Sequence, residues 1–222
     1  MSPADRFEVR ALPGRVPYPR ALALQRELVE RRKAGAIGDT LILLEHASVI
    51  TLGRNADAAG VVASEALLRR RGIQVHRAER GGQATYHGPG QVVGYPIVDL
   101  HGLGLGVAAY VRRLEETMVR AAGRLGVEAG RREGLTGVFA EPGKIGAVGV
   151  RVTRGVTYHG FALNADPELE HYRLIVPCGL LDTPVTSLAA ILGRPLPFAE
   201  AREAVAAAFA EVFGVELVPT RG

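Results

Sequence analysis

The chain has 222 residues, of which 47% are hydrophobic and 23% charged, a composition typical of one globular domain. No apolar run approaches the ~18 residues that a membrane-spanning helix needs, so we expect no membrane partner. The first residues, MSPADRFEVR, contain no secretory signal, and the single cysteine has no internal disulfide partner. The sequence therefore predicts one soluble, cytoplasmic domain over residues 1–222.

The net charge is +4, and all but two of the 27 lysine and arginine residues are arginine. The arginine-rich stretches RELVERRK, LLRRR and GRREG are interleaved with glutamate or have helical spacing. This pattern is typical of solvated helix faces, so we expect no nucleic-acid partner. A weak attraction to an acidic protein partner stays open.

Hydrophobic periodicity and glycine or proline breaks predict the secondary structure. From the N-terminus we expect a strand at 6–12, a helix at 18–33, two strands in 40–53 with a turn at 46–48, and a helix from Ser64 to Gly72. Then follow strands at 73–77 and 92–100, a helix at 105–125, about four strands in 126–164 with a hairpin tip at Arg154–Gly155, helices at 187–192 and 198–213, and a strand at 215–218. Hairpin strands with separated helices indicate an α+β fold, with a mixed, largely antiparallel sheet flanked by helices.

The stretch RGGQATYHGPGQ, from Arg80 to Gln91, is expected to be a loop between two strands. It has neither the dinucleotide nor the P-loop spacing, and no helix is predicted after it, so it does not predict a phosphate site. Glycine allows main-chain N–H groups to approach a ligand closely. A tight inter-strand turn is the alternative, but the interleaved polar side chains favour a ligand-facing loop.

Cys178 follows the strand-like RLIVP and precedes Gly179. A buried, inert thiol and a nucleophile, with the Gly179 N–H facing a developing oxyanion, are both compatible with this corner. A thiol with a pKa of about 8.5 needs a nearby base or cation to act as a nucleophile at neutral pH.

Lys144 begins an apolar strand in a chain that otherwise uses arginine for its cations, which favours a site that needs a compact amine able to lose its proton. Two histidines are candidates for a role: His87 in the loop and His159, expected to end a strand and to introduce main-chain donors and an apolar wall from GFA. The spacing of the histidines and the cysteine predicts no metal site. The remaining histidines are interpreted as surface or hydrogen-bonded core residues: His46, His76, His101 and His171.

Four motifs occur in order: RGGQATYHGPGQ with VVGYPIVDL, GKIGAVGVRV, HGFALN and PCGLLDTPVTSL. From about residue 41 to 192 the chain resembles the lipoyl(octanoyl) transferases, the octanoyl-[acyl-carrier-protein]:protein transferases of lipoate biosynthesis. Lipoate and biotin protein ligases share their fold. The resemblance therefore implies one α+β domain like the catalytic domain of those ligases.

The resemblance also implies the site. The family's acyl-thioester nucleophile falls on Cys178, and the lysine that lowers the thiol pKa falls on Lys144. The acyl-binding residues fall on three segments: Arg80, Gly81, Gly82, Gln83, Ala84, Thr85, Tyr86 and His87; Ala147, Val148 and Gly149; and Gly160, Phe161 and Ala162.

The implied reaction is a double displacement without ATP or another cofactor. Cys178 takes octanoyl from octanoyl-acyl carrier protein and passes it to a lysine of lipoyl domains, those of 2-oxoacid dehydrogenase E2 subunits and the glycine cleavage H protein. Lys144 and His87 both remain candidates for the base that deprotonates the acceptor amine. Two alternatives stay open: an ATP-dependent lipoate- or biotin-protein ligase, and a non-catalytic lipid- or RNA-binding module.

Overall fold

The structure is a computed structural model that describes residues 6–57, 60–176 and 184–220. In chain order its elements are β1 (Arg6–Val16), α1 (Tyr18–Lys33), β2 (Thr40–His46), β3 (Val49–Leu52), α2 (Glu65–Arg70), β4 (Gln74–Arg77), β5 (Ala84–His87), β6 (Gln91–Ile97), α3 (Val107–Arg124), β7 (Val138–Ala140), β8 (Gly143–Thr153), β9 (Val156–Asn164), the 3₁₀ helix η3 (Leu169–Leu174), α4 (Leu188–Leu192), α5 (Phe198–Phe213) and β10 (Glu216–Pro219).

The described strands form two sheets. The larger sheet has seven strands in the order β10-β1-β2-β6-β9-β8-β7, and the smaller has the order β4-β3-β5. In the larger sheet β1 runs parallel to β10 and β2, while the pairs from β2 to β7 are antiparallel. The expected α+β fold with a mixed, largely antiparallel sheet is confirmed.

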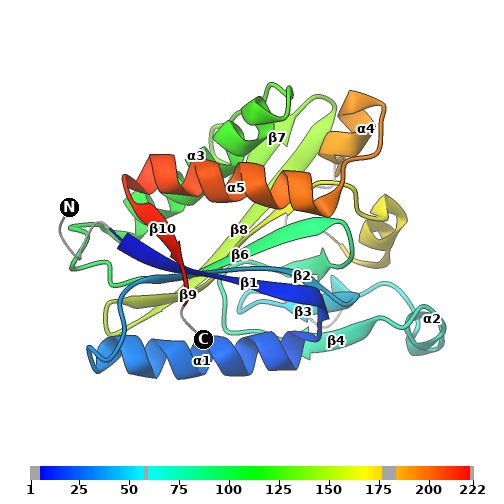
Figure 1. Ribbon diagram of the computed structural model, residues 1–222. Coiled ribbons are helices and arrows are strands. Elements are labelled where there is room, and N and C mark those ends of the chain that lie inside the picture. The colour runs from blue at the N-terminus through cyan, green and yellow to red at the C-terminus, as the bar shows by residue number, and fades with distance from the viewer. Residues whose placement is uncertain (1–5, 58–59, 177–183, 221–222) are drawn as a thin grey trace.

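Helices cover both faces of the seven-stranded sheet: α3 and α5 lie on one face and α1 on the other (Figure 1). Alternation along β2 explains this arrangement, because successive side chains of a strand point to opposite faces. Leu41 and Leu43 join the core with α3 and α5, whereas Ile42 and Leu44 join the core with α1. No helix in the described ranges is long and apolar enough to cross a membrane.

Several predicted boundaries are confirmed. The helices predicted at 18–33 and 198–213 are α1 and α5. The Ser64 Oγ accepts a hydrogen bond from the Leu67 N–H at 3.3 Å and caps α2. Arg154 and Gly155, with φ of 49° and 82°, form the tip between β8 and β9.

Four expectations about the secondary structure are wrong. Part of the expected loop is strand β5, which pairs antiparallel with β3, because the β-forming Thr and Tyr outweigh the flanking glycines. The segment before Cys178 is not a strand but ends η3, and Ile175 forms an isolated bridge with Val61. His159 lies inside β9 rather than at its end, and three strands rather than four occupy 126–164, with one extra bridge from Gly130 to Phe139.

Candidate active site

A pocket of about 230 Å³ lies over the hairpin of β8 and β9. Two of the predicted binding segments face each other there, since Ala147 pairs with Ala162, Val148 with Phe161 and Gly149 with Gly160. The described residues that line the pocket are Tyr18, Thr51, Arg80, Gly82, Ala84, Thr85, His87, Tyr95, Gly134, Leu135, Thr136, Lys144, Gly146, Ala147, Val148, Gly149, His159, Gly160, Phe161, Ala162, Asn164, Tyr172, Ile175 and Val185. The folded chain thus brings most of the predicted residues to one cavity.

The loop from Arg80 to Gly82 closes one side of the pocket by lying against β8. The Gly81 N–H donates to the Val150 carbonyl at 3.1 Å. A Cβ on Gly149 would lie 3.0 Å from Arg80 Cδ, so glycine is needed for the loop to approach the strand this closely. The Gly81 N–H is therefore bonded within the fold, and Gly81 does not line the pocket.

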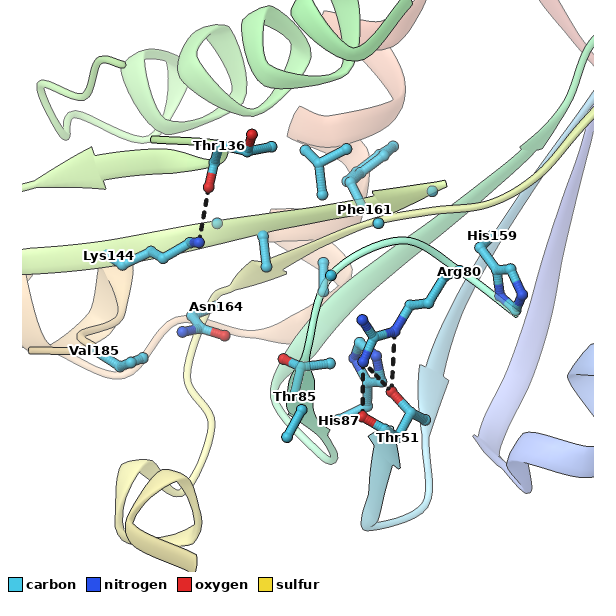
Figure 2. A pocket seen from close by; sticks show the side chains of 18 of the residues that line it. Thr51, Arg80, Thr85, His87, Thr136, Lys144, His159, Phe161, Asn164 and Val185 are labelled. Atoms are coloured by element: carbon cyan, nitrogen blue, oxygen red, sulfur yellow. Dashed lines mark hydrogen bonds between the residues drawn. The ribbon is translucent and has the colours of Figure 1, made fainter. Parts of the chain in front are cut away.

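Arg80 is buried and fixed by its own loop. Its guanidinium donates to the Thr51 carbonyl at 2.7 Å and to Thr51 Oγ1 at 2.8 and 3.2 Å (Figure 2). It also donates to the Gln83 carbonyl at 2.9 Å. These bonds tie the loop to β3. Arg80 lines the pocket, but most of its donors serve the loop, so its first role is to hold the wall in place.

The other residues of this loop divide between the pocket and the core. Gly82, Ala84, Thr85 and His87 line the pocket, whereas Gly81, Gln83 and Tyr86 do not. Tyr86 is buried, and its hydroxyl bonds Ser48 Oγ at 3.1 Å and His171 Nδ1 at 2.9 Å. Tyr86 therefore fixes strand β5 to the core and does not line the pocket.

The segment Gly160–Ala162 contributes a wall rather than main-chain donors. Phe161 pairs with Val148 on one side and with Gly94 on the other, so the segment lies between β8 and β6. Main-chain groups of an interior strand are used by the two neighbouring ladders. The expectation of free N–H donors is wrong here, and the expectation of an apolar wall fits the phenyl ring of Phe161, which lines the pocket.

Lys144 lies at the second position of β8 with its ammonium in the pocket wall. Nζ donates to the Thr136 carbonyl at 2.9 Å (Figure 2). It also lies 5.6 Å from the centre of the Phe139 ring. The Lys144 main chain pairs with the segment after residue 183: its N–H donates to the Pro184 carbonyl at 2.8 Å, and its carbonyl accepts from the Thr186 N–H at 3.0 Å.

A buried carboxylate braces the segment that contacts Lys144. Glu115 Oε1 accepts a hydrogen bond from the Gly137 N–H at 2.8 Å. Gly137 directly follows Thr136, whose carbonyl accepts the hydrogen bond from Lys144 Nζ. The Glu115 side chain is 1% exposed, and Arg112 pairs with it at 3.0 Å. Helix α3 therefore fixes the position of the Lys144 ammonium through Gly137.

Gly137→Ala is expected to displace the Lys144 side chain. Gly137 has a φ of 125°, and an added Cβ would lie 2.5 Å from both Lys144 Cε and the Gly146 carbonyl oxygen. A misplaced reacting group typically costs about 10²-fold in rate, so we expect kcat/KM for acyl transfer to fall by about that factor. The control is Gly126→Ala, which has a similarly positive φ of 84° but open space around the added methyl. Equal activities of the two variants would contradict this placement.

Three buried histidines are held neutral near the pocket. Burial lowers the pKa of His46 to about 4 and that of His159 to about 4, with the Arg80 charge lowering the latter further. Burial, helped by His46 and Arg80, also lowers the pKa of His87 well below its usual value. His46 Nδ1 donates to the Val16 carbonyl at 2.8 Å, so its Nε2 accepts from the Tyr95 hydroxyl at 2.7 Å.

These histidines predict a loss of stability in weak acid. The unfolded chain binds protons near pH 6.5 while folded His46 and His159 bind them near pH 4, so the free energy of unfolding falls as pH decreases between these values. At ~1.4 kcal/mol per pKa unit, the loss between pH 6.5 and pH 5 is of the order of 2 kcal/mol for each. Urea unfolding at pH 7 and pH 5 measures it. His46→Gln should lessen the fall, and substitution of the exposed His101 by Gln should leave it unchanged; an identical fall in both variants would contradict the assignment.

Cys178 lies outside the described residues. Ile175, shortly before the undescribed segment, and Val185, shortly after it, both line the pocket. The sequence did not predict several other residues that line the pocket. Some lie outside the quoted motifs, and others lie within a motif but were given no binding role. The clearest signal was GLTGVF, in which Gly137 directly follows Thr136 and leaves room for the Lys144 side chain. The missed residues are Tyr18, Thr51, Tyr95, Gly134, Leu135, Thr136, Gly146, Asn164, Tyr172, Ile175 and Val185.

A family model described as "Lipoyl protein ligase A/B catalytic domain" matches residues 17–210, so the chain belongs to this family. Within it, a protein named Octanoyltransferase from Koribacter versatilis (strain Ellin345) is 50% identical over 205 residues, covering 90% of this chain and 82% of the relative. An Octanoyltransferase from Alkaliphilus metalliredigens (strain QYMF) is 47% identical over 208 residues, covering 93% and 95%. The family and the enzyme class inferred from the motifs, an acyltransferase, are confirmed.

Solved structures confirm the fold. Lipoate-protein ligase A bound with ATP superposes with a TM-score of 0.75 and 18% identity, covering 96% of this chain and 89% of that one. A bi-partite lipoate protein ligase from Thermoplasma acidophilum gives a TM-score of 0.74 and 18% identity, covering 96% and 87%. At this identity the likeness concerns the fold alone.

Proposed function

We propose that the chain, as a single acyltransferase domain over 1–222, transfers an octanoyl group from octanoyl-acyl carrier protein to a lysine of lipoyl domains through a thioester on Cys178. One observation carries the proposal: Lys144 lies in the wall of a largely apolar pocket in a chain about half identical to proteins named Octanoyltransferase. The acceptors we propose are the lipoyl domains of 2-oxoacid dehydrogenase E2 subunits and the glycine cleavage H protein. A reactive thiol must stay reduced, which suits the cytoplasm.

Chain geometry supports Cys178 as the nucleophile. It is three residues from Ile175, which lines the pocket, and a fully extended chain spans at most about 3.6 Å per residue. The Cys178 Cα is therefore within roughly 11 Å of the Ile175 Cα. At the other end of the undescribed segment, the main chain of Pro184 pairs with Lys144 itself. The segment that contains Cys178 therefore follows a residue that lines the pocket and leads into the main chain that pairs with Lys144.

The proton balance of the two steps fits a lysine. As a cation, Lys144 stabilises the Cys178 thiolate, which attacks the donor thioester. The carbon–sulfur bond to the carrier's thiol breaks, and the leaving thiolate takes the proton from Lys144. The acceptor ammonium releases one proton to solvent, and the neutral Lys144 amine accepts a second proton from the same nitrogen as it attacks the acyl-enzyme. Cys178 then leaves as a thiolate, and Lys144 is a cation again.

His87 is the weaker candidate for this base. Burial and the charges of His46 and Arg80 hold its pKa well below the usual range, and a base that binds protons so weakly at neutral pH gains little by accepting one.

The donor thioester and the acyl-enzyme are of similar energy and the amide is lower, so no ATP is needed. The apolar wall can stabilise the bound chain by about 0.8 kcal/mol per buried methylene.

A transfer assay tests the proposal. The protein is incubated with octanoyl-carrier protein and a lipoyl domain without ATP, and in parallel with free octanoate and ATP. We expect one octanoyl group on the lipoyl domain in the first reaction and none in the second. Modification that strictly requires ATP would support the ligase alternative and contradict the proposal.

The arginine excess predicts a salt dependence for the donor step. If the basic protein attracts an acidic carrier protein, raising the salt concentration from about 0.05 to 0.5 M should lower kcat/KM by about tenfold, since steering of this kind is screened. A short octanoyl thioester without the carrier protein is the control and should show little dependence. The same response for both donors would contradict steering.

A further inference from the structure

Two buried polar atoms in the pocket wall have no hydrogen-bond partner within the described residues: Tyr18 Oη and His159 Nε2. Tyr18 is 3% exposed and His159 2%. Leaving a buried donor or acceptor unpaired is costly, so such groups usually bond to a ligand or to an ordered water. Because both side chains line the pocket, a guest in the pocket can supply the missing partner.

The two side chains belong to one end of the pocket. A series of ring contacts joins them: Tyr18 to His46 with centroids 5.7 Å apart, His46 to Tyr95 at 5.8 Å, and Tyr95 to His159 at 6.3 Å. The charge of the Arg80 guanidinium acts on both Tyr18 and His159. The rings of Tyr18, His46, Tyr95 and His159 therefore form one connected cluster.

Both rings are held firmly. The Tyr18 ring lies between His46, at 5.7 Å, and His76, at 5.6 Å. His159 has a φ of 56°, which is uncommon for a residue other than glycine, and its N–H donates to Gln25 Oε1 at 2.8 Å. Backbone strain of this kind persists where the surroundings fix it, and it clusters at ligand sites.

The cluster lies far from Lys144. His159 pairs with Val150, which is six residues along β8 from Lys144, or roughly 20 Å at ~3.3 Å per residue. Figure 2 shows Lys144 and His159 at opposite sides of the view, with Phe161 between them. The intervening wall of Ala147, Val148, Phe161 and Ala162 is apolar. The pocket thus has a reactive end, an apolar middle and a polar far end.

We propose that Tyr18 Oη and His159 Nε2 form a polar subsite for the tail end of the acyl chain, one that takes a single hydroxyl-sized group able to donate and accept hydrogen bonds. The inference rests on the proposed function, because it places the acyl carbonyl beside Lys144. The Tyr18 hydroxyl is protonated, since burial raises its pKa to about 12, and the lowered pKa of His159 keeps it neutral. The two therefore suit a neutral guest.

Two sources supply this chemistry: a water molecule, or a hydroxyl group at the end of an acyl chain. An extended octanoyl chain spans roughly 9 Å, because each ~1.5 Å carbon–carbon bond of the zigzag advances the chain by about 1.3 Å. It therefore stops before the subsite and leaves room for the water. A longer alkyl chain displaces the water and leaves both polar atoms unpaired. A longer chain with a terminal hydroxyl replaces the lost bonds, so the subsite selects by both length and tail polarity.

The test measures octanoyl, dodecanoyl and 12-hydroxydodecanoyl carrier-protein thioesters as donors for the unmodified protein and for two variants, Tyr18→Phe and Tyr110→Phe. Tyr110→Phe is the control, because it removes the same hydroxyl from a fully buried core tyrosine outside the pocket lining. The unmodified protein should use the hydroxylated twelve-carbon chain about tenfold better than dodecanoyl in kcat/KM. Tyr18→Phe should bring this ratio close to one, and Tyr110→Phe should keep it. A ratio that is the same in all three proteins overturns the subsite.

Two further measurements keep the inference separate from the proposed function. Calorimetry with dodecanoic and 12-hydroxydodecanoic acids measures the same preference as a ratio of Kd without any turnover, so it stands even if no acyl group is transferred. His159→Asn, whose side chain tolerates positive φ, replaces Tyr18→Phe if that variant does not fold. Crystal structures with each acid distinguish the sources: water between Tyr18 and His159 beneath a short acid, or the tail hydroxyl in its place. An empty subsite in both overturns the inference.

Discussion

Cys178→Ser is expected to abolish octanoyl transfer, with kcat/KM lower by about 10³-fold or more, because a serine hydroxyl stays protonated where a thiol forms a thiolate. The pocket, Lys144 and the apolar wall remain in this variant, so binding of the donor should change little. A rapid-quench assay with octanoyl-carrier protein and a lipoyl domain measures the loss.

The sequence provides a matching control for this result. Cys178 is the only cysteine, so one equivalent of a thiol-alkylating reagent modifies one site in the unmodified protein and none in Cys178→Ser. Prior incubation with octanoyl-carrier protein should protect the thiol from alkylation. Full transfer activity in Cys178→Ser, with an unchanged melting temperature, would contradict the thioester mechanism and favour a route without a covalent acyl-enzyme.

Lys144→Arg is expected to separate the two steps. Arginine keeps the positive charge that favours the thiolate but does not release its proton. Cys178 should still take up one octanoyl group, with the leaving carrier thiolate taking its proton from solvent instead of from residue 144. Transfer from the acyl-enzyme to the acceptor amine should slow by about 10²-fold or more, the usual contribution of a general base. Single-turnover experiments that follow the acyl-enzyme and the octanoylated lipoyl domain separately measure both effects.

The only other lysine is the natural control. Lys33 lies at the end of α1, where Nζ contacts Glu30 Oε1 at 2.8 Å and Thr153 Oγ1 at 3.3 Å, outside the pocket lining. Lys33→Arg should transfer octanoyl at the unmodified rate. If Lys144→Arg also transferred at that rate, Lys144 would not be the base, and the neutral imidazole of His87 would have to be tested next.

Much of the fold could be predicted because its elements have local signals. The stripe on α3 and the alternation of β2 follow directly from periods of 3.6 and 2 residues. The loop at 80–91 was harder, because its glycines conceal the short strand β5, whose pairing with β3 depends on residues about 35 positions away. No local pattern shows that β4 and β6, on either side of this loop, join different sheets.

The candidate site shows the same division. The family resemblance implied Lys144 and the segments 147–149 and 160–162, and the predicted hairpin tip brings the strands that contain them side by side. The brace from Glu115 to Gly137 comes from a different helix, and Tyr18 reaches the pocket from α1. Glu115 and Tyr18 lie in no recognisable sequence motif, because only tertiary packing decides which buried polar groups face the cavity. Arg80 could be identified as important, but its bonds to Thr51 show that it holds the wall.

The most direct test of the central claim is intact-protein mass spectrometry after incubation with octanoyl-carrier protein alone, without ATP or an acceptor. The thioester mechanism predicts a mass increase of one octanoyl group, located on Cys178 by peptide mapping and lost when a lipoyl domain is added. An unmodified protein that nevertheless octanoylates the lipoyl domain, or an adduct on any other residue, would contradict it.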